Sequence, residues 1–164
     1  MKKILISIRP QWCEKIASGK KTIEVRKSAP KEVPFKAYIY CTKGKAQSRC
    51  GKVIGEFVCN KVATYPRNYE FGYEISENEF NETALTAEQF VGYGNGGMLY
   101  GWHISDLKIY DKPRELSEFC IPCKVSCENC KNPLYFECSC EEKGKKIVTR
   151  PPQSYMRVEE LKEV

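Results

Sequence analysis

Residues 16–26, with the sequence IASGKKTIEVR, decide how the fold is predicted. Before them, an apolar run at 4–8 fits a buried strand, and Pro10 suits the first turn of a helix because that position needs no amide donor. Gly19 follows the apolar stripe of this segment and is the residue type that commonly ends a helix. We therefore expect a strand, a short helix and a second strand, in that order.

At the end of this stretch, residues 22–26, polar and apolar residues alternate. Ile23 and Val25 are apolar, whereas Thr22, Glu24 and Arg26 are polar. Successive side chains of a β-strand point to opposite faces, so we expect one face to pack into a core. The other face then carries the polar groups.

Lys21 enters this strand from the glycine-terminated helix. We expect its ammonium group to converge with the Glu24 carboxylate and the Arg26 guanidinium. A buried lysine beside a carboxylate changes its pKa readily, and arginine offers a planar fork for a phosphate or a base edge. The alternative is a solvated ion pair worth under ~1 kcal/mol.

Further apolar runs at 35–42, 52–62 and 99–110 predict more strands. Residues 63–85 are weakly patterned and are predicted to be irregular, while 86–89 have the form of a helical capping box. Several strands with few, short helices predict a mainly β (α+β) protein, a barrel rather than a layered parallel sheet.

Charge is distributed unevenly along the 164 residues. Residues 1–60 carry 14 Lys and Arg against 4 Asp and Glu, whereas residues 61–164 carry 13 against 17. This asymmetry favours a polyanion-binding face, although a solvated lysine-rich surface gives the same counts. The length fits a single domain over 1–164. No apolar run approaches the ~18 residues of a membrane helix, and the start lacks a signal-peptide core, so we expect a cytoplasmic protein without a membrane partner.

Residues 16–26 resemble the signature of the ASCH domain family, in which a helix ends in Ser/Ala-Gly-x-Lys-Thr and a Glu-x-Arg strand follows. Residues 38–41 and 51–57 resemble the second and third barrel strands of that family. Residues 99–104 and 150–154 resemble a phage- and prophage-encoded branch of it. The resemblance covers nearly the whole chain outside the irregular stretch. It implies a β-barrel of the PUA-like class that binds RNA or a nucleotide in a basic cleft.

The resemblance also implies an enzymatic alternative. Some small bacterial members are amidohydrolases of acetylated cytidine that use a lysine, a threonine and a helix-borne glutamate. Lys21 matches the lysine, Glu24 stands in place of the threonine, and Glu88 is a candidate for the glutamate. Loss of the hydroxyl group disfavours the same mechanism.

We therefore predict binding as the function, with a hydrolase of modified nucleosides or a ribonuclease using Lys21 and Glu24 as the alternative. A module that binds a protein partner is a third interpretation. The predicted ligand-binding residues are Trp12, Lys20, Lys21, Thr22, Glu24, Arg26 and His103, with Tyr40 and Trp102 as further aromatic candidates.

Six of the ten cysteines lie between residues 120 and 140. In a reducing compartment, cysteines clustered at short spacings more often bind metal than form disulfides. Four thiolates around one Cys-x-x-Cys knuckle suit a structural zinc, which would stabilise an insert too small to bury a core. The alternative is a set of free thiols, or of disulfides formed on purification. The predicted zinc ligands are Cys123, Cys127, Cys130 and Cys138, with Cys140 or Cys120 as alternates, in an insert at 120–140.

Overall fold

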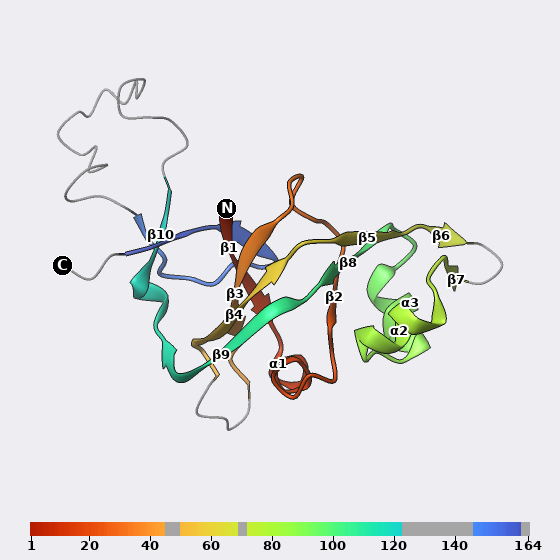
Figure 1. Cartoon of the computed structure of the whole chain (residues 1–164), viewed down its shortest axis with the longest axis horizontal. Coiled ribbons are helices and arrows are strands. Elements are labelled where there is room, and N and C mark those ends of the chain that lie inside the picture. The colour runs from red at the N-terminus through yellow and green to blue at the C-terminus, as the bar shows by residue number, and fades with distance from the viewer. Residues whose placement is uncertain (45–49, 69–71, 123–145, 162–164) are drawn as a thin grey trace, which may run out of the picture.

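A five-stranded sheet forms the centre of the molecule in the computed structural model, which describes residues 1–44, 50–68, 72–122 and 146–161 (Figure 1). Its strand order is β12-β1-β3-β4-β9. The β1–β3 pair is parallel and the other three pairs are antiparallel. The strands are β1 (Lys2–Ile8), β3 (Phe35–Cys41), β4 (Val53–Cys59), β9 (Ser105–Arg114) and β12 (Tyr155–Arg157).

The predicted helix is confirmed as α1 (Pro10–Ala17), which follows β1 directly. Pro10 occupies its first turn, where the missing amide costs no hydrogen bond. Gly19 adopts a φ of +73°, a left-handed conformation that glycine reaches without steric cost. The chain therefore turns sharply out of the helix and delivers residue 21 to the start of β2 (Ile23–Arg26).

A second, three-stranded sheet has the order β2-β8-β5, with β8 at Leu99–His103 and β5 at Val62–Tyr65. Ile104 is the single residue between β8 and β9, so the chain passes directly from this sheet into the central one. The ladders of the described residues form separate sheets of five, three, three and two strands, and they show no closed barrel. The fold is mainly β with three short α-helices in this part of the chain.

The prediction that residues 63–85 are irregular is wrong. They include β6 (Arg67–Asn68), β7 (Gly72–Tyr73) and α2 (Glu77–Thr83), besides most of β5. Elements of two to seven residues are too short to leave a period in the sequence. The capping box is confirmed, because Thr86 and Gln89 exchange hydrogen bonds at the start of α3 (Ala87–Gly94). Helices α2 and α3 lie together at one end of the molecule (Figure 1).

A small sheet at the other end joins β10 (Phe119–Ile121) to β11 (Lys146–Ile147) and β13 (Glu159–Glu160). The 3-10 turn η1 (Leu116–Glu118) leads into it. Glu160 connects this sheet to the centre by accepting hydrogen bonds from Lys3 at 3.0 Å and from Arg114 at 2.6 Å.

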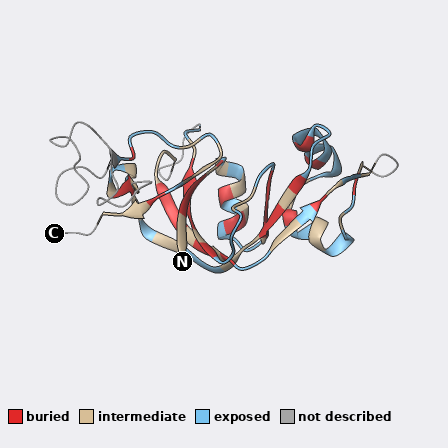
Figure 2. Cartoon of the chain, turned by 90° about the horizontal axis from the view of Figure 1, so that it is seen from above, coloured by how far each residue is buried: buried red, intermediate tan, exposed pale blue. Residues whose placement is uncertain are grey.

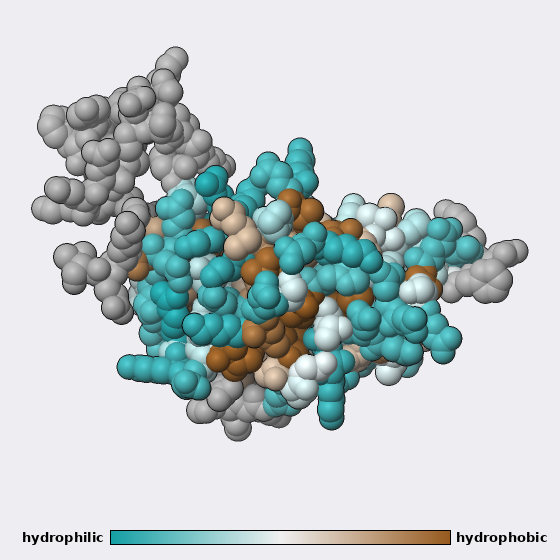
Figure 3. Space-filling view, viewed as in Figure 1, coloured by the Kyte–Doolittle hydropathy of each residue, from teal (hydrophilic) through white to brown (hydrophobic). Residues whose placement is uncertain are grey.

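Three apolar clusters make up the core, and the buried segments follow the strands (Figure 2). One lies between the central sheet and α1, the second supports the small sheet, and the third joins β2 to the helical end. The face seen in Figure 3 is mostly hydrophilic, with apolar residues near its middle. The described helices include none that is long and apolar enough to span a membrane.

Candidate functional site

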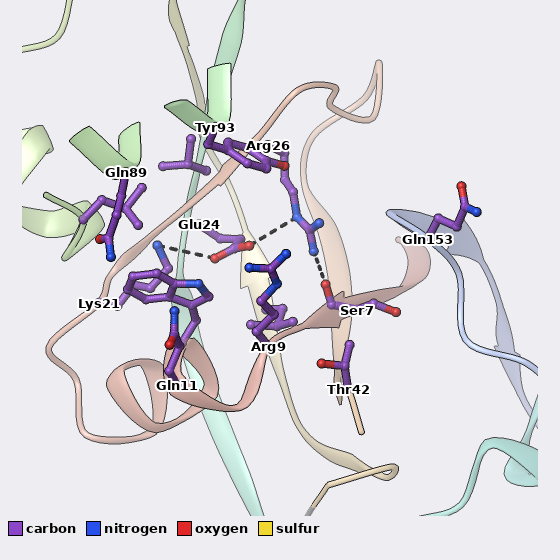
Figure 4. A pocket seen from close by; sticks show the side chains of 14 residues that line it. Ser7, Arg9, Gln11, Lys21, Glu24, Arg26, Thr42, Gln89, Tyr93 and Gln153 are labelled. Carbon is purple, nitrogen blue, oxygen red and sulfur yellow. Dashed lines mark hydrogen bonds and ion pairs between the residues drawn. The ribbon is translucent and has the colours of Figure 1, made fainter. Parts of the chain in front are cut away.

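A cavity of about 490 Å³ opens where α1, β2 and α3 meet (Figure 4). Its size lies within the range of small-molecule and cofactor sites. Its walls combine apolar side chains with a group of charged and amide side chains. The lining residues are Ser7, Ile8, Arg9, Gln11, Trp12, Lys21, Glu24, Val25, Arg26, Thr42, Leu85, Gln89, Tyr93 and Gln153.

Lys21 is fixed at the base of this cavity. Its side chain is only 2% exposed, and its Nζ donates hydrogen bonds to the carbonyl oxygens of Ile23 at 2.8 Å and Thr83 at 2.7 Å. The Glu24 Oε2 atom lies 3.4 Å from the same nitrogen. Since an ammonium group has three protons, each has an acceptor. Burial lowers the pKa of Lys21, and the neighbouring Glu24 carboxylate opposes that shift.

Arg26 lies on the other side of Glu24. Its Nε is 3.2 Å from Glu24 Oε1, and an Nη2–H donates to the backbone oxygen of Ser7. The Nε atom makes this contact as an ion pair, without the alignment of a hydrogen bond. Both side chains are under a tenth exposed. The three buried groups, two cations and one carboxylate, thus carry a net positive charge.

The alternation of β2 explains this arrangement. Ile23 and Val25 pack into the third core cluster, which includes Phe90 of α3. The intervening residues Glu24 and Arg26 consequently face the other way, as the sequence predicted. The expected convergence with Lys21 is confirmed by the distances above.

The rim of the cavity is basic and aromatic. Arg9 is exposed just before α1, and its guanidinium extends toward the Glu24 carboxylate (Figure 4). The half-buried Trp12 ring forms one wall, with the Nζ of Lys15 4.8 Å from its centroid. On the opposite side, the Nζ of Lys27 lies 5.3 Å from the centre of the Tyr93 ring.

Several predicted ligand-binding residues and the catalytic candidate Glu88 lie outside this lining. Lys20 and Glu88 are exposed, and the Thr22 amide donates to the Glu82 carbonyl oxygen. His103 is the last residue of β8, and its Nε2 lies 3.4 Å from Glu79 Oε1. Tyr40 and Trp102 are buried in the core clusters. Among the predicted residues described, the cavity thus gathers Trp12, Lys21, Glu24 and Arg26.

Sequence reasoning missed the other polar groups of the lining. Gln89 reaches the cavity because α3 packs against β2. Gln153 reaches it because the Ser7 hydroxyl donates a hydrogen bond to the neighbouring Pro152 carbonyl oxygen at 2.6 Å. These contacts join segments far apart in the chain, so no local pattern signals them. Arg9 was the residue with a usable signal, since it stands next to the helix start at Pro10.

The predicted zinc ligands Cys123, Cys127, Cys130, Cys138 and the alternate Cys140 lie outside the described residues. The other alternate, Cys120, is buried in β10, and its thiol donates to the Glu159 carbonyl oxygen at 3.5 Å. Within the described ranges, no group of three or more His, Cys, Asp or Glu side chains is arranged to hold a metal ion.

The fold is similar to crystal structures of an ASCH protein from Zymomonas mobilis. One of them is 21% identical to this chain, with a TM-score of 0.62 over 96% of this chain and 88% of that one. A serine-to-alanine mutant gives 20% identity and a TM-score of 0.61 over 96% and 89%. A tyrosine-to-phenylalanine mutant gives 23% and 0.57 over 71% and 77%.

No protein-family model matches the sequence, and no curated protein matches it either. The structural likeness is at low identity and concerns the architecture. The chain therefore has an ASCH-like fold.

Proposed function

We propose that this protein binds RNA or a nucleotide in the cavity between α1, β2 and α3. The observation that carries the proposal is the buried group of Lys21, Glu24 and Arg26 at the base of a cavity with a tryptophan wall. A net positive charge in a poorly solvated site attracts phosphate, and an aromatic face stacks a base.

The contacts assign different roles to the three cations. Lys21 has its protons committed to protein acceptors, so it holds Glu24 in place and supplies positive potential. Arg26 is partly committed, to Ser7 and Glu24, and keeps Nη1 protons for a ligand. Arg9 is exposed and extends into the site, so it is the group that meets a phosphate directly.

The Glu24 carboxylate offers a base-recognition group in the same place. Each of its oxygens faces one cation, and a carboxylate has about four lone-pair positions. A remaining position can accept a hydrogen bond from an exocyclic amino group, as acidic side chains do from cytosine. The stacked base would then lie on Trp12, with its polar edge toward Glu24.

The ASCH-like fold supports this proposal, because the family resemblance of residues 16–26 implies RNA or nucleotide binding. The basic rim supports it as well. A protein-partner function has less support, since the cavity and its charge are features of small-ligand and nucleic-acid sites.

The proposal is tested with a fluorescently labelled single-stranded RNA and its anisotropy. Wild type should bind, and Arg9→Gln should bind more weakly. The matched control is Lys108→Gln, which removes an exposed cation from β9, outside the cavity lining. Equal losses for the two variants would mean that the cavity is not the binding site.

One observation favours a hydrolase as the second candidate. Lys21 and Glu24 lie 3.4 Å apart in the buried base of the cavity, where burial lowers the pKa of Lys21 and the Glu24 carboxylate opposes that shift. Such a pair could activate water against an acylated nucleoside or a phosphodiester. The test is the release of cytidine from acetylated cytidine, and of fragments from RNA, by wild type and by Lys21→Met. Absence of both activities in wild type rejects this candidate.

We also propose a structural zinc site in the segment 120–140, held by Cys123, Cys127, Cys130 and Cys138. The position of Cys120 inside β10 supports a ligand set that begins at Cys123. Four thiolates leave no open position for water, so the metal would stabilise the fold and take no part in chemistry.

A further inference from the structure

Three thiols lie close together at the end of β3. Cys41 is the last residue of β3, Cys13 belongs to α1, and Cys50 comes shortly before β4. The Sγ atoms of Cys41 and Cys50 are 3.7 Å apart, and the Cys13 thiol donates to the Ile8 carbonyl oxygen at 3.6 Å. Neither the proposed ligand site nor the proposed zinc site uses these residues.

The backbone fixes the relation between Cys41 and Cys50. The Cys41 amide donates to the Lys52 carbonyl oxygen at 2.9 Å, and the Gly51 amide donates to the Cys41 carbonyl oxygen at 2.8 Å. Gly51 has a φ of +84°, a left-handed conformation that glycine adopts without steric cost, in the turn that precedes β4. These two backbone hydrogen bonds hold Cys50, the residue before Gly51, beside Cys41, so that the two thiols are in contact.

The two thiols differ in access to solvent. Cys41 is 2% exposed, whereas Cys50 is only partly buried. Burial and the neighbouring Cys50 raise the pKa of Cys41 to about 11, so Cys41 is a neutral thiol near pH 7. An oxidant from solution therefore reaches Cys50 first.

We propose that Cys41 and Cys50 are a site of reversible oxidation, at which a peroxide converts the two thiols into a disulfide. The Cys50 thiolate attacks one oxygen of hydrogen peroxide, which yields a sulfenic acid and hydroxide. The Cys41 sulfur then displaces that oxygen, forms the S–S bond and, with its proton, releases water. Two electrons pass from the thiols to the peroxide, and a dithiol reverses the step.

The site adjoins the proposed ligand cavity and is independent of it. Thr42, next to Cys41, lines the cavity and donates its amide to the Ile8 carbonyl oxygen at 2.9 Å. The disulfide would tie this wall to the start of β4. A short loop closed by a disulfide constrains the unfolded chain, and we expect the thermal midpoint to rise by about 5 °C.

The test exposes the full-length native protein to hydrogen peroxide, blocks the remaining thiols with N-ethylmaleimide and maps the cysteines by peptide mass spectrometry. We expect a peptide that links Cys41 to Cys50 and disappears with dithiothreitol. In Cys41→Ser, the Cys50 sulfenic acid should persist and react with dimedone. In Cys50→Ser, Cys41 should stay reduced.

Cys59→Ser is the matched control, because Cys59 is a buried thiol on β4 whose Sγ donates to the Lys61 carbonyl oxygen. It should keep the Cys41–Cys50 link and the rise in thermal midpoint. The proposal is overturned if both thiols stay free while other cysteines oxidise. It is also overturned if Cys50 pairs with a cysteine of the segment 120–140 instead.

Discussion

Glu24→Gln tests the buried charge group most sharply, because it removes one charge and preserves the shape of the side chain. The carboxylate lies 3.4 Å from Lys21 Nζ and 3.2 Å from Arg26 Nε. At an effective dielectric constant of about 20, each contact is an attraction of about 5 kcal/mol. Desolvation and the mutual repulsion of the two cations offset much of that sum.

Removing one partner from a buried ion pair leaves the other charge uncompensated and costs about 3–5 kcal/mol. We expect Glu24→Gln to lower the free energy of unfolding by this amount, measured by urea denaturation near pH 7. The control is Glu32→Gln, whose carboxylate pairs with Lys2 at 3.7 Å and is 76% exposed. That variant should lose less than ~1 kcal/mol.

The pH dependence supplies a second readout with a definite sign. Burial lowers the folded-state pKa of Lys21 below its usual 10.5. At pH values between the folded-state pKa and 10.5, the unfolded chain therefore binds more protons than the folded one. Stability therefore rises as the pH rises toward 10.5. Glu24→Gln removes the carboxylate that opposes the shift and should steepen this rise. A loss no larger than that of Glu32→Gln, with an unchanged pH dependence, would refute the buried charge group.

Three further predictions concern Trp12, Glu160 and the segment 120–140. Trp12→Ala should weaken RNA binding by roughly 5- to 150-fold in the anisotropy assay, since a stacked base contributes ~1–3 kcal/mol, and an unchanged affinity would show that no base lies on this ring. Burial would raise the pKa of Glu160, but hydrogen bonds from Arg114 and Lys3 lower it from 4.5 to about 2. The free energy of unfolding should therefore decrease as the pH falls from 4.5 to about 2, and it should decrease less steeply in Glu160→Gln. Identical acid-denaturation profiles of the two proteins would contradict this. Reduced full-length protein should carry about one zinc per chain by metal analysis, and a content near zero would reject the zinc site.

The sequence predicted the part of the site that depends on local pattern. The period of two in β2 separates Ile23 and Val25 from Glu24 and Arg26, and the helix stop at Gly19 brings in Lys21. These features need only the neighbouring residues, so an analysis of the sequence can find them.

The remainder of the site depends on contacts between distant segments. Thr83 accepts a hydrogen bond from Lys21 across 62 positions, and Gln89 and Tyr93 reach the cavity from α3. Within residues 63–85, β5 pairs with β8, α2 packs against β2, and β6 pairs with β7. These elements are too short to leave a period in the sequence, and their partners are not visible from local pattern. Tyr40 and Trp102 were candidates for stacking on a base because they are aromatic, but both side chains are buried in the core.

The salt dependence of RNA binding tests the central claim most directly. If phosphates meet Arg9 and Arg26 in the cavity, the association constant should fall steeply between about 50 and 200 mM salt, with a log–log slope of about −0.7 per phosphate contact. Arg9→Gln should make that slope shallower, and Lys108→Gln should leave it unchanged. Single-stranded RNA that fails to bind, or binds with an affinity independent of salt, would contradict the account.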